Sequence, residues 1–325
     1  MRHSALYMAS LFVLSACGGR SNLAEDSTLY AGTRADTVQA KLLDGETVKA
    51  KTAQMNAVLL DWETGGVAAV NPKTMAIRLP DGTDEDVTLI LDGKKVTFTS
   101  ADRQLQDDGI TYYGWSQDGD NPRYSLWTWS NGPASNSISA SGDSFVNVFE
   151  VFFDATDGTT YAAYSVSGTE TRDEVLGGLG TASYSGWANI KAYPNGSYDG
   201  FETVQRLEAS DVQMNADFGT GTISGSMGDL NWGWTGDRDA RVDVPGKIRM
   251  EAATIASDGS YSGTLAPNSA FEANDVVSTT GGTFSGDFFG PAANQTAGAI
   301  GMSFEADGTD YVGTGIFNTE KITGE

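Results

Sequence analysis

Polar and apolar residues alternate in many short stretches of this chain. In "TFSGDFFG" at residues 283–290, Phe284, Gly286 and Phe288 fall on one side of an extended chain, and hydroxyl and acidic residues fall on the other. A period of two residues is typical of a β-strand with one buried face. Long helical periodicity is hard to find, so the pattern predicts an almost all-β protein.

Eight such stretches follow one another after residue 178. The faces opposite their apolar sides carry Ser, Thr, Asn, Asp, Lys and Glu, as in an antiparallel sheet with one wet face. The predicted inward sets are Ala182, Tyr184, Ala188, Ile190; Val212, Met214, Ala216, Phe218; Ile223, Met227; Ile248, Met250, Ala252; Tyr261, Leu265; Phe284, Phe288; Ile300, Met302, Phe304; and Tyr311, Phe317. We therefore predict an eight-stranded antiparallel β-barrel over residues 179–325, filled by its own side chains.

A short repeat runs through the same region, in the order hydroxyl residue, large apolar residue, Ser, Gly. It occurs at residues 183–186, 222–225, 260–263 and 283–286. The large residue and the glycine always share the inward face. A glycine inside a strand is typical of a tight bend or a barrel corner, where a side chain would crowd the interior. The small residues of "AGAIG", 297–301, are expected where the returning strand meets residues 283–290.

The region before the barrel, residues 38–178, is also predicted to be β-rich. Asp92-Gly93 and Asp157-Gly158 each lie between apolar runs, which indicates hairpins. We expect a separate N-terminal domain here.

The N-terminus predicts export and lipidation. Residues 1–16 contain an early arginine and an apolar run too short to span a bilayer, which is typical of a signal peptide. The run ends in "LSAC", which resembles the bacterial lipobox. That resemblance implies cleavage before Cys17, lipid attachment to its thiol and, with Gly18 next, sorting to the outer membrane. Residues 17–37 are then a polar, lipidated tether.

Charge and residue counts exclude several functions. The 325 residues have a formal net charge of −23, which makes nucleic acid a poor partner. Cys17 is the only cysteine, so no disulfide within the chain can form. His3 is the only histidine and leaves with the predicted signal peptide, so catalytic triads and histidine-ligated metals or haem are excluded. We expect no enzyme activity and no cofactor.

The barrel region resembles the β-barrel domain of transferrin-binding protein B and related bacterial surface lipoproteins. The resemblance rests on "GTASYSG", "ADFGTGTISGSM", "YSGTL", "GGTFSGDFFGPAANQTAGAIGMSF" and "YVGTGIFNTEK", which occur in the family's order over residues 179–325. It implies a lipid-anchored protein, often displayed on the cell surface, with a β-rich "handle" domain before the barrel. No segment corresponds to a transferrin contact.

The strongest candidate for binding is the loop expected between the third and fourth barrel strands. Trp and Arg dominate the energetics of many protein interfaces, and loops on a rigid scaffold often bind. The candidate residues are Trp232, Trp234, Asp237, Arg238, Asp239 and Arg241. The alternative is that both tryptophans plug the barrel and the charges are only solvated. Asp237, Asp239 and Asp243 could also bind Ca²⁺, although the spacing is not that of an EF-hand loop.

A second aromatic group lies in the N-terminal region. Its members are Tyr112, Tyr113, Trp115, Tyr124, Trp127 and Trp129. Such residues can stack on haem or a sugar, but alternating aromatics more often form the core of a small sheet.

These observations predict a lipoprotein of the outer membrane, exposed at the cell surface, that binds a partner without catalysis. The resemblance suggests a protein partner such as an iron or haem carrier. The alternatives are a carrier of a small ligand in the envelope and a structural envelope lipoprotein without a ligand. An open cavity in the barrel would favour the carrier, and a filled barrel with an apolar, tryptophan-bearing surface would favour the receptor.

Overall fold

The computed structural model describes residues 56–61, 64–70, 75–78, 87–91, 94–99, 103–107, 111–117, 124–129, 145–154, 159–168, 171–199, 203–234, 241–268, 271 and 277–322. These residues are almost all in β-strands, which confirms the predicted class. Within these ranges, no helix has the length and apolar character that crossing a membrane requires.

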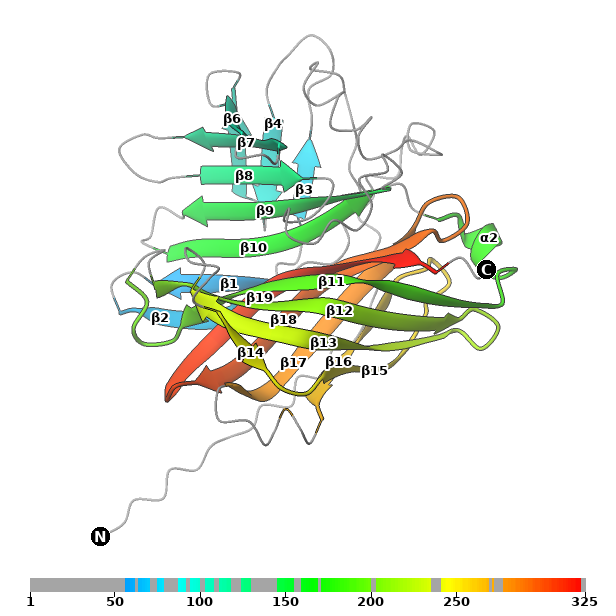
Figure 1. The fold of residues 1–325 in the computed structure, drawn as a ribbon. Helices are drawn as coiled ribbons and strands as arrows, with labels where there is room; N and C mark the ends of the chain where they lie inside the picture. Colours follow the sequence, from blue (N-terminus) through cyan, green and yellow to red (C-terminus); the bar gives the residue numbers. More distant parts are fainter. Residues whose placement is uncertain are drawn as a thin grey trace.

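Eight antiparallel strands close into a barrel in the C-terminal half of the chain (Figure 1). They are β11 (Thr181–Pro194), β12 (Gln205–Asp217), β13 (Thr222–Trp234), β15 (Ile248–Thr254), β16 (Tyr261–Pro267), β17 (Val277–Phe289), β18 (Gln295–Ala306) and β19 (Thr309–Lys321). Each pairs with the next, and β19 pairs with β11, which closes the ring. A short strand, β14 (Val242–Val244), pairs with the end of β13. The predicted eight-stranded barrel is confirmed.

Apolar side chains from all eight strands pack into one buried cluster inside the barrel. The ring of Phe288 lies 6.0 Å from that of Tyr184 and 5.4 Å from that of Tyr261, measured between centroids. The hydroxyl groups at this level are satisfied locally, since Tyr184 donates to the carbonyl oxygen of Ala293 and Tyr261 bonds Thr296. Burial of this apolar surface is the main force that stabilises the barrel.

One predicted inward residue, Ala252, faces solvent instead. Ile223 pairs with Ala253 and Gly225 pairs with Met250, so a β-bulge places two residues of β15 opposite one of β13. The bulge shifts the alternation by one residue. Ala253 is therefore buried at the position that was predicted for Ala252.

The glycines of the four repeats lie where the strands approach one another too closely for a side chain. A Cβ placed on each would come within 2.7 Å or less of another heavy atom, which real Cβ atoms essentially never do. The nearby atoms are Thr319 Cα for Gly186, Met214 Sδ for Gly225, Phe284 Cε1 for Gly263 and the Ala297 carbonyl oxygen for Gly286. The repeat thus corresponds to crowded points of the barrel wall, as predicted.

Two further antiparallel sheets form the N-terminal part. The larger has the strand order β2-β1-β10-β9-β8-β7-β6, and the smaller has the order β3-β4-β5. The strands are β1 (Asn56–Asp61), β2 (Gly66–Val70), β3 (Met75–Arg78), β4 (Val87–Leu91), β5 (Lys94–Phe98), β6 (Arg103–Asp107), β7 (Thr111–Gln117), β8 (Tyr124–Trp129), β9 (Val146–Asp154) and β10 (Thr159–Gly168). The β4–β5 and β9–β10 pairs flank the two predicted hairpin turns. The domain boundary near residue 178 stays a prediction.

The larger sheet packs against the outer wall of the barrel over β11, β18 and β19 (Figure 1). Two buried clusters make this contact. One contains Val146, Val148, Tyr164 and Val166 from the sheet with Trp187, Phe289, Ala297 and Ile316 from the barrel. The other contains Val58, Leu60, Val67 and Ala162 with Tyr193, Tyr198, Val204 and Val312. The sheet therefore covers one side of the barrel and leaves its two ends for loops and turns.

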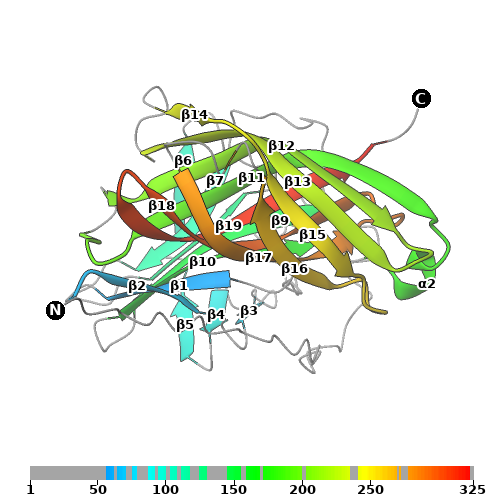
Figure 2. The same cartoon turned by 90° about the horizontal axis from the view of Figure 1, so that it is seen from below.

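One end of the barrel is closed by the segment that leads into it. The helix α2 (Asp173–Leu176) precedes β11, and its Leu176 is buried in the barrel cluster. Thr171 donates its backbone N–H to the Phe288 carbonyl oxygen at 2.9 Å and its hydroxyl to that of Gly290 at 2.7 Å. Figures 1 and 2 both place β14 and the turn between β18 and β19 at the opposite end. We call that opposite end the rim.

Candidate functional site

The two tryptophans of the candidate binding loop lie on β13. Trp232 is only 5% exposed, and its ring meets Phe304 and Tyr311 edge-on at centroid distances of 5.3 and 5.1 Å. Phe304 and Tyr311 in turn stack at 5.7 Å. Trp232 is therefore a buried residue of β13 and not an exposed loop residue. Its ring fills the barrel interior just below the rim, which agrees for this residue with the alternative that the tryptophans plug the barrel.

A change of alternation in β13 explains the burial of Trp232. Ile223 and Met227 face the interior in the first half of the strand, and Leu230 and Trp232 face it in the second half. Asp229, between the two halves, has φ of 49°, in the left-handed region that non-glycine residues rarely adopt. Unbroken alternation from Ile223 would have turned Trp232 outward.

Trp234 is different, because it is 42% exposed. It follows Trp232 by two residues and so lies on the same side of β13, one step nearer to the rim. Val242 on β14 pairs with Trp232 and is 46% exposed. Trp234 and Val242 are thus diagonal neighbours across two paired strands, at a separation that large side chains can bridge. Together they form an exposed apolar pair above a buried aromatic cluster.

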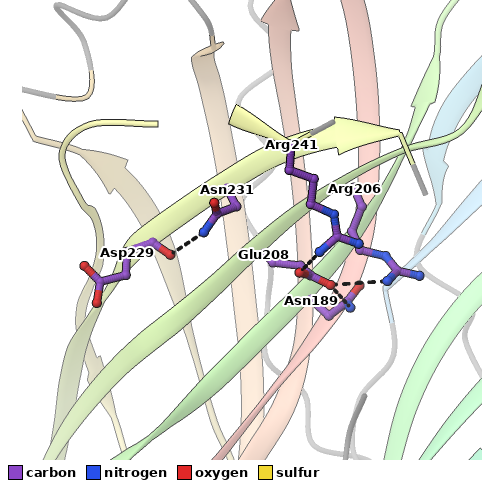
Figure 3. Close-up of polar contacts among 6 residues, drawn as sticks. All are labelled: Asn189, Arg206, Glu208, Asp229, Asn231 and Arg241. Atoms are coloured by element: carbon purple, nitrogen blue, oxygen red, sulfur yellow. Dashed lines mark hydrogen bonds and ion pairs between the residues drawn. The ribbon is translucent and has the colours of Figure 1, made fainter. Parts of the chain in front are cut away.

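Arg241, the last candidate residue, is held against the outer wall of the barrel. Its guanidinium and that of Arg206 both pair with the carboxylate of Glu208 on β12, and Asn189 donates its side-chain N–H to the same carboxylate at 3.2 Å (Figure 3). The side chains of Arg206, Glu208 and Arg241 are 16%, 13% and 9% exposed. Arg241 is therefore a buried anchor for the chain that enters β14, and the prediction of an exposed binding arginine is wrong for it.

Two smaller features of β13 lie beside Arg241. A Cβ on Gly233 would lie 3.0 Å from the Arg241 Cα, so the absence of a side chain at Gly233 lets Arg241 cross β13 closely. Asn231 donates its side-chain N–H to the Asp229 carbonyl oxygen at 3.4 Å, beside the same crossing (Figure 3).

Other predicted site residues lie outside the described part of the chain or lack described side chains. Cys17, Asp237, Arg238 and Asp239 belong to the first group. Asp243, the third acid of the calcium hypothesis, is exposed on β14. The N-terminal aromatic residues Tyr112, Tyr113, Trp115, Tyr124, Trp127 and Trp129 lie on β7 and β8, which pair with each other.

The structure also contains a polar contact that the sequence patterns did not indicate. Lys191 on β11 pairs with Glu150 on β9, and its ammonium group lies 5.8 Å from the centre of the Tyr164 ring. Burial, and then the nearby Glu150 carboxylate, raise the pKa of Tyr164 well above 10.0. This ion pair joins the larger sheet to the barrel. The partners are 41 residues apart, and no local pattern links them.

The described residues thus form a filled eight-stranded β-barrel with one covered side and an exposed aromatic rim. The rim offers the indole ring of Trp234 and the aliphatic side chain of Val242. Beneath them lies the partly buried phenol of Tyr311, whose pKa is raised first by burial and then by Asp307. Such groups suit non-covalent recognition.

Comparison with known proteins gives matches at the level of structure. No family model and no curated protein sequence matches the chain. The chain is similar to a double mutant of transferrin-binding protein B from Haemophilus parasuis Hp5, with 13% identity, a TM-score of 0.44 and coverage of 84% of this chain and 46% of that one. It is also similar to isotype 1 transferrin-binding protein B from serogroup B Neisseria meningitidis, with 15% identity, a TM-score of 0.35 and coverage of 83% and 44%.

A third solved structure is described only as a surface lipoprotein. It matches with 13% identity and a TM-score of 0.35, over 84% of this chain and 100% of that one. The chain therefore spans just under half the length of the transferrin-binding protein B chains it matches and a length similar to that of the surface lipoprotein.

Proposed function

We propose that this protein is a lipid-anchored protein of the bacterial outer membrane that faces outward and binds a protein partner without catalysis. The observation that carries the proposal is the exposed pair of Trp234 and Val242 at the end of a filled barrel. Large apolar side chains that are exposed side by side are typical of interaction sites.

The filled interior favours a receptor over a carrier of a small ligand. The side chains of all eight barrel strands share one buried cluster, and the aromatic rings of Trp232, Phe304 and Tyr311 pack beneath the rim. A surface site at the rim is the arrangement that such a barrel supports best.

The anchor and the partner are finer parts of the proposal. Lipid attachment at Cys17 is supported by the "LSAC" sequence and the short apolar run before it. An iron or haem carrier is the first partner to test, because the barrel motifs of the sequence resemble those of transferrin-binding protein B.

Protease shaving of intact cells that express the full-length protein tests the proposal. A periplasmic protein of known location reports whether the outer membrane is sealed, and Cys17→Ala tests the anchor. We expect the protein to be clipped while the periplasmic marker survives, and we expect Cys17→Ala to release it from the membrane fraction. Protection until the outer membrane is opened would exclude surface capture of a macromolecule and would favour a role inside the envelope.

A further inference from the structure

The chemistry around the exposed apolar pair defines its partner more narrowly. Among the described residues, the exposed large hydrophobic side chains are Trp234, Val242 and Ile322. Trp234 and Val242 lie together at the rim, whereas Ile322 follows β19 at the other end and donates its backbone N–H to the Ser183 carbonyl oxygen. Two of the three exposed large hydrophobic side chains in the described part of the chain therefore lie at the rim.

The β18–β19 turn lies at the same end of the barrel as this pair. Trp232, which is paired with Val242, contacts Tyr311 and Phe304 from β19 and β18. Tyr311 and Phe304 are themselves paired, and two further residue pairs separate them from the turn. The loop after β11 reaches the same place, because Asn195 donates its backbone N–H to the Asp310 carbonyl oxygen at 2.7 Å.

These neighbouring segments carry exposed carboxylates. They are Asp199 after β11, Asp243 on β14, and Glu305, Asp307 and Asp310 in and beside the β18–β19 turn. Glu305 and Asp310 face each other in the strand register, which places two like charges side by side. Carboxylates so arranged attract a cation and repel an anionic surface.

Among the described residues, the basic side chains nearest to this end are already paired with carboxylates of the barrel or of the larger sheet. Lys191, Arg206 and Arg241 are each paired with a glutamate and are at most 16% exposed. Lys247 and Arg249 are 49% and 58% exposed, and they pair with Asp211 at 3.4 Å and with Glu251 at 3.2 Å, further along the wall. The exposed residues that the structure describes at the rim are thus apolar at Trp234 and Val242 and acidic at Asp199, Asp243, Glu305, Asp307 and Asp310.

We propose that the rim is a docking surface for a cationic polypeptide segment, one that inserts an apolar side chain against Trp234 and Val242 and places Lys or Arg among the surrounding carboxylates. This inference rests on the proposed binding function and specifies the partner's chemistry. The apolar contact supplies most of the affinity, and the carboxylates supply orientation and a fast, salt-dependent association.

A phage-displayed library of random 12-residue peptides, panned on the folded protein, tests the inference. Clones that still bind Trp234→Ala are removed, and Ile322→Ala serves as the matched control for loss of an exposed apolar side chain at the other end. We expect the remaining clones to be enriched in Lys and Arg with at least one aromatic or aliphatic residue. For a synthetic enriched peptide, Trp234→Ala should weaken binding roughly tenfold or more, and Ile322→Ala should not.

Charge variants separate a specific surface from the general attraction of an acidic protein for a basic peptide. Glu305→Gln with Asp310→Asn should weaken binding of the same peptide roughly three- to tenfold at low salt. Glu174→Gln with Asp173→Asn, on α2 at the other end, removes the same charge and should leave binding unchanged. An equal effect of the two pairs would overturn the inference, as would a library without Trp234-dependent clones.

The outcomes also distinguish this inference from the proposed function. Trp234-dependent clones that are neutral or acidic would refute the cationic partner and leave a protein-binding rim in place. Protection of the protein in the shaving experiment would refute the surface receptor whatever the peptides show.

Discussion

Gly286 on β17 and Gly298 on β18 are partners in the strand register, and each lies too close to the facing strand to carry a side chain. A Cβ on Gly286 would lie 2.6 Å from the Ala297 carbonyl oxygen, and one on Gly298 would lie 2.6 Å from the Gly286 Cα and still closer to the Ser285 carbonyl oxygen. The obstacles are mostly backbone atoms, which cannot turn aside as a flexible side chain can. The paired glycines therefore permit a sharp bend in the barrel wall.

Gly298→Ala should destabilise the fold strongly. The new methyl group meets the backbone of β17, so either the β17–β18 pairing shifts or the wall opens. Overpacking of a filled core typically costs about 1–3 kcal/mol, and the backbone contact here places the expected loss near the upper end, about 3 kcal/mol. Urea unfolding followed by circular dichroism measures it.

Gly177→Ala is the control for this change. Gly177 has φ of −60°, and a Cβ added to it would meet no neighbouring heavy atom within 4 Å, so alanine fits there without strain. We expect a change within about 0.5 kcal/mol. If Gly298→Ala unfolds at the same urea concentration as Gly177→Ala, β17 and β18 do not approach each other as closely as described.

The strands of the barrel could be predicted from the sequence because each has one buried and one wet face. The alternation of apolar and polar residues predicts each strand, and the repeated glycines indicate where the barrel wall bends. The position of Ala252 could not be predicted, because a β-bulge opposite Ser224 adds one residue to β15 and leaves no mark in the apolar pattern. The contact of the larger sheet with the barrel joins residues distant in sequence, such as Glu150 and Lys191, and periodicity does not report such pairs.

Glu208→Gln should destabilise the protein by about 2 kcal/mol. The change removes the charge that Arg206 and Arg241 share, while both guanidinium groups stay largely buried. Loss of one partner from a fully buried ion pair costs about 3–5 kcal/mol, and partial contact with solvent lowers the value here. The free energy of unfolding in urea, measured at pH 7, gives the result.

Glu251→Gln provides the comparison, because Glu251 pairs with Arg249 on the exposed surface, where the side chains are 45% and 58% exposed. An exposed ion pair contributes about 0–1 kcal/mol, so this variant should unfold almost as the wild type does. Equal losses for Glu208→Gln and Glu251→Gln would show that Arg241 is not anchored as described.

The stability of the protein should fall steeply above pH 10. Burial raises the pKa of Tyr164, Tyr193 and Tyr261 well above the ordinary 10.0. Above pH 10 these tyrosines ionise in the unfolded chain and stay protonated in the folded one, so the unfolded state binds fewer protons and gains stability. Each contributes a loss of about 1.4 kcal/mol per pH unit in that range. Below pH 9 their contribution is constant.

Urea unfolding at pH 8, 10 and 11 measures this loss. Tyr261→Phe should reduce the loss of unfolding free energy per pH unit by the contribution of one tyrosine. The absorbance of tyrosinate at 295 nm follows ionisation directly. If buried tyrosinate forms near pH 10 while the circular dichroism stays that of the folded protein, the three side chains are not buried as described.

The pattern of apolar and polar residues does not predict the burial of the two tryptophans in the candidate site. Trp232 and Trp234 share a short, polar, glycine-containing stretch, and the sequence does not show which ring is buried in the barrel and which is exposed. The change of alternation at Gly228 and Asp229, where both strands of the β12–β13 pair turn their other face inward, puts both tryptophans on the inner side. Their distance from the rim then makes Trp232 buried and Trp234 exposed. The left-handed Asp229 is compatible with its sequence but not demanded by it.

Replacement of each tryptophan in turn should give opposite results. Trp232→Ala removes a ring that contacts Phe304 and Tyr311 in the interior and should cost about 3–5 kcal/mol of stability. Trp234→Ala removes an exposed ring and should change the stability by about 0.5 kcal/mol at most. Thermal and urea unfolding of the two variants, side by side, measure both.

Quenching of tryptophan fluorescence tests the exposure of Trp232 and Trp234 independently. The indole of Trp234 should be quenched readily by iodide, whereas that of Trp232 should be protected until the protein unfolds. Trp234→Ala should therefore remove part of the quenchable emission of the folded protein and leave the melting temperature in place. If Trp232→Ala were the harmless change and Trp234→Ala the destabilising one, the described depths of the two rings would be wrong, and the rim surface proposed above would not exist.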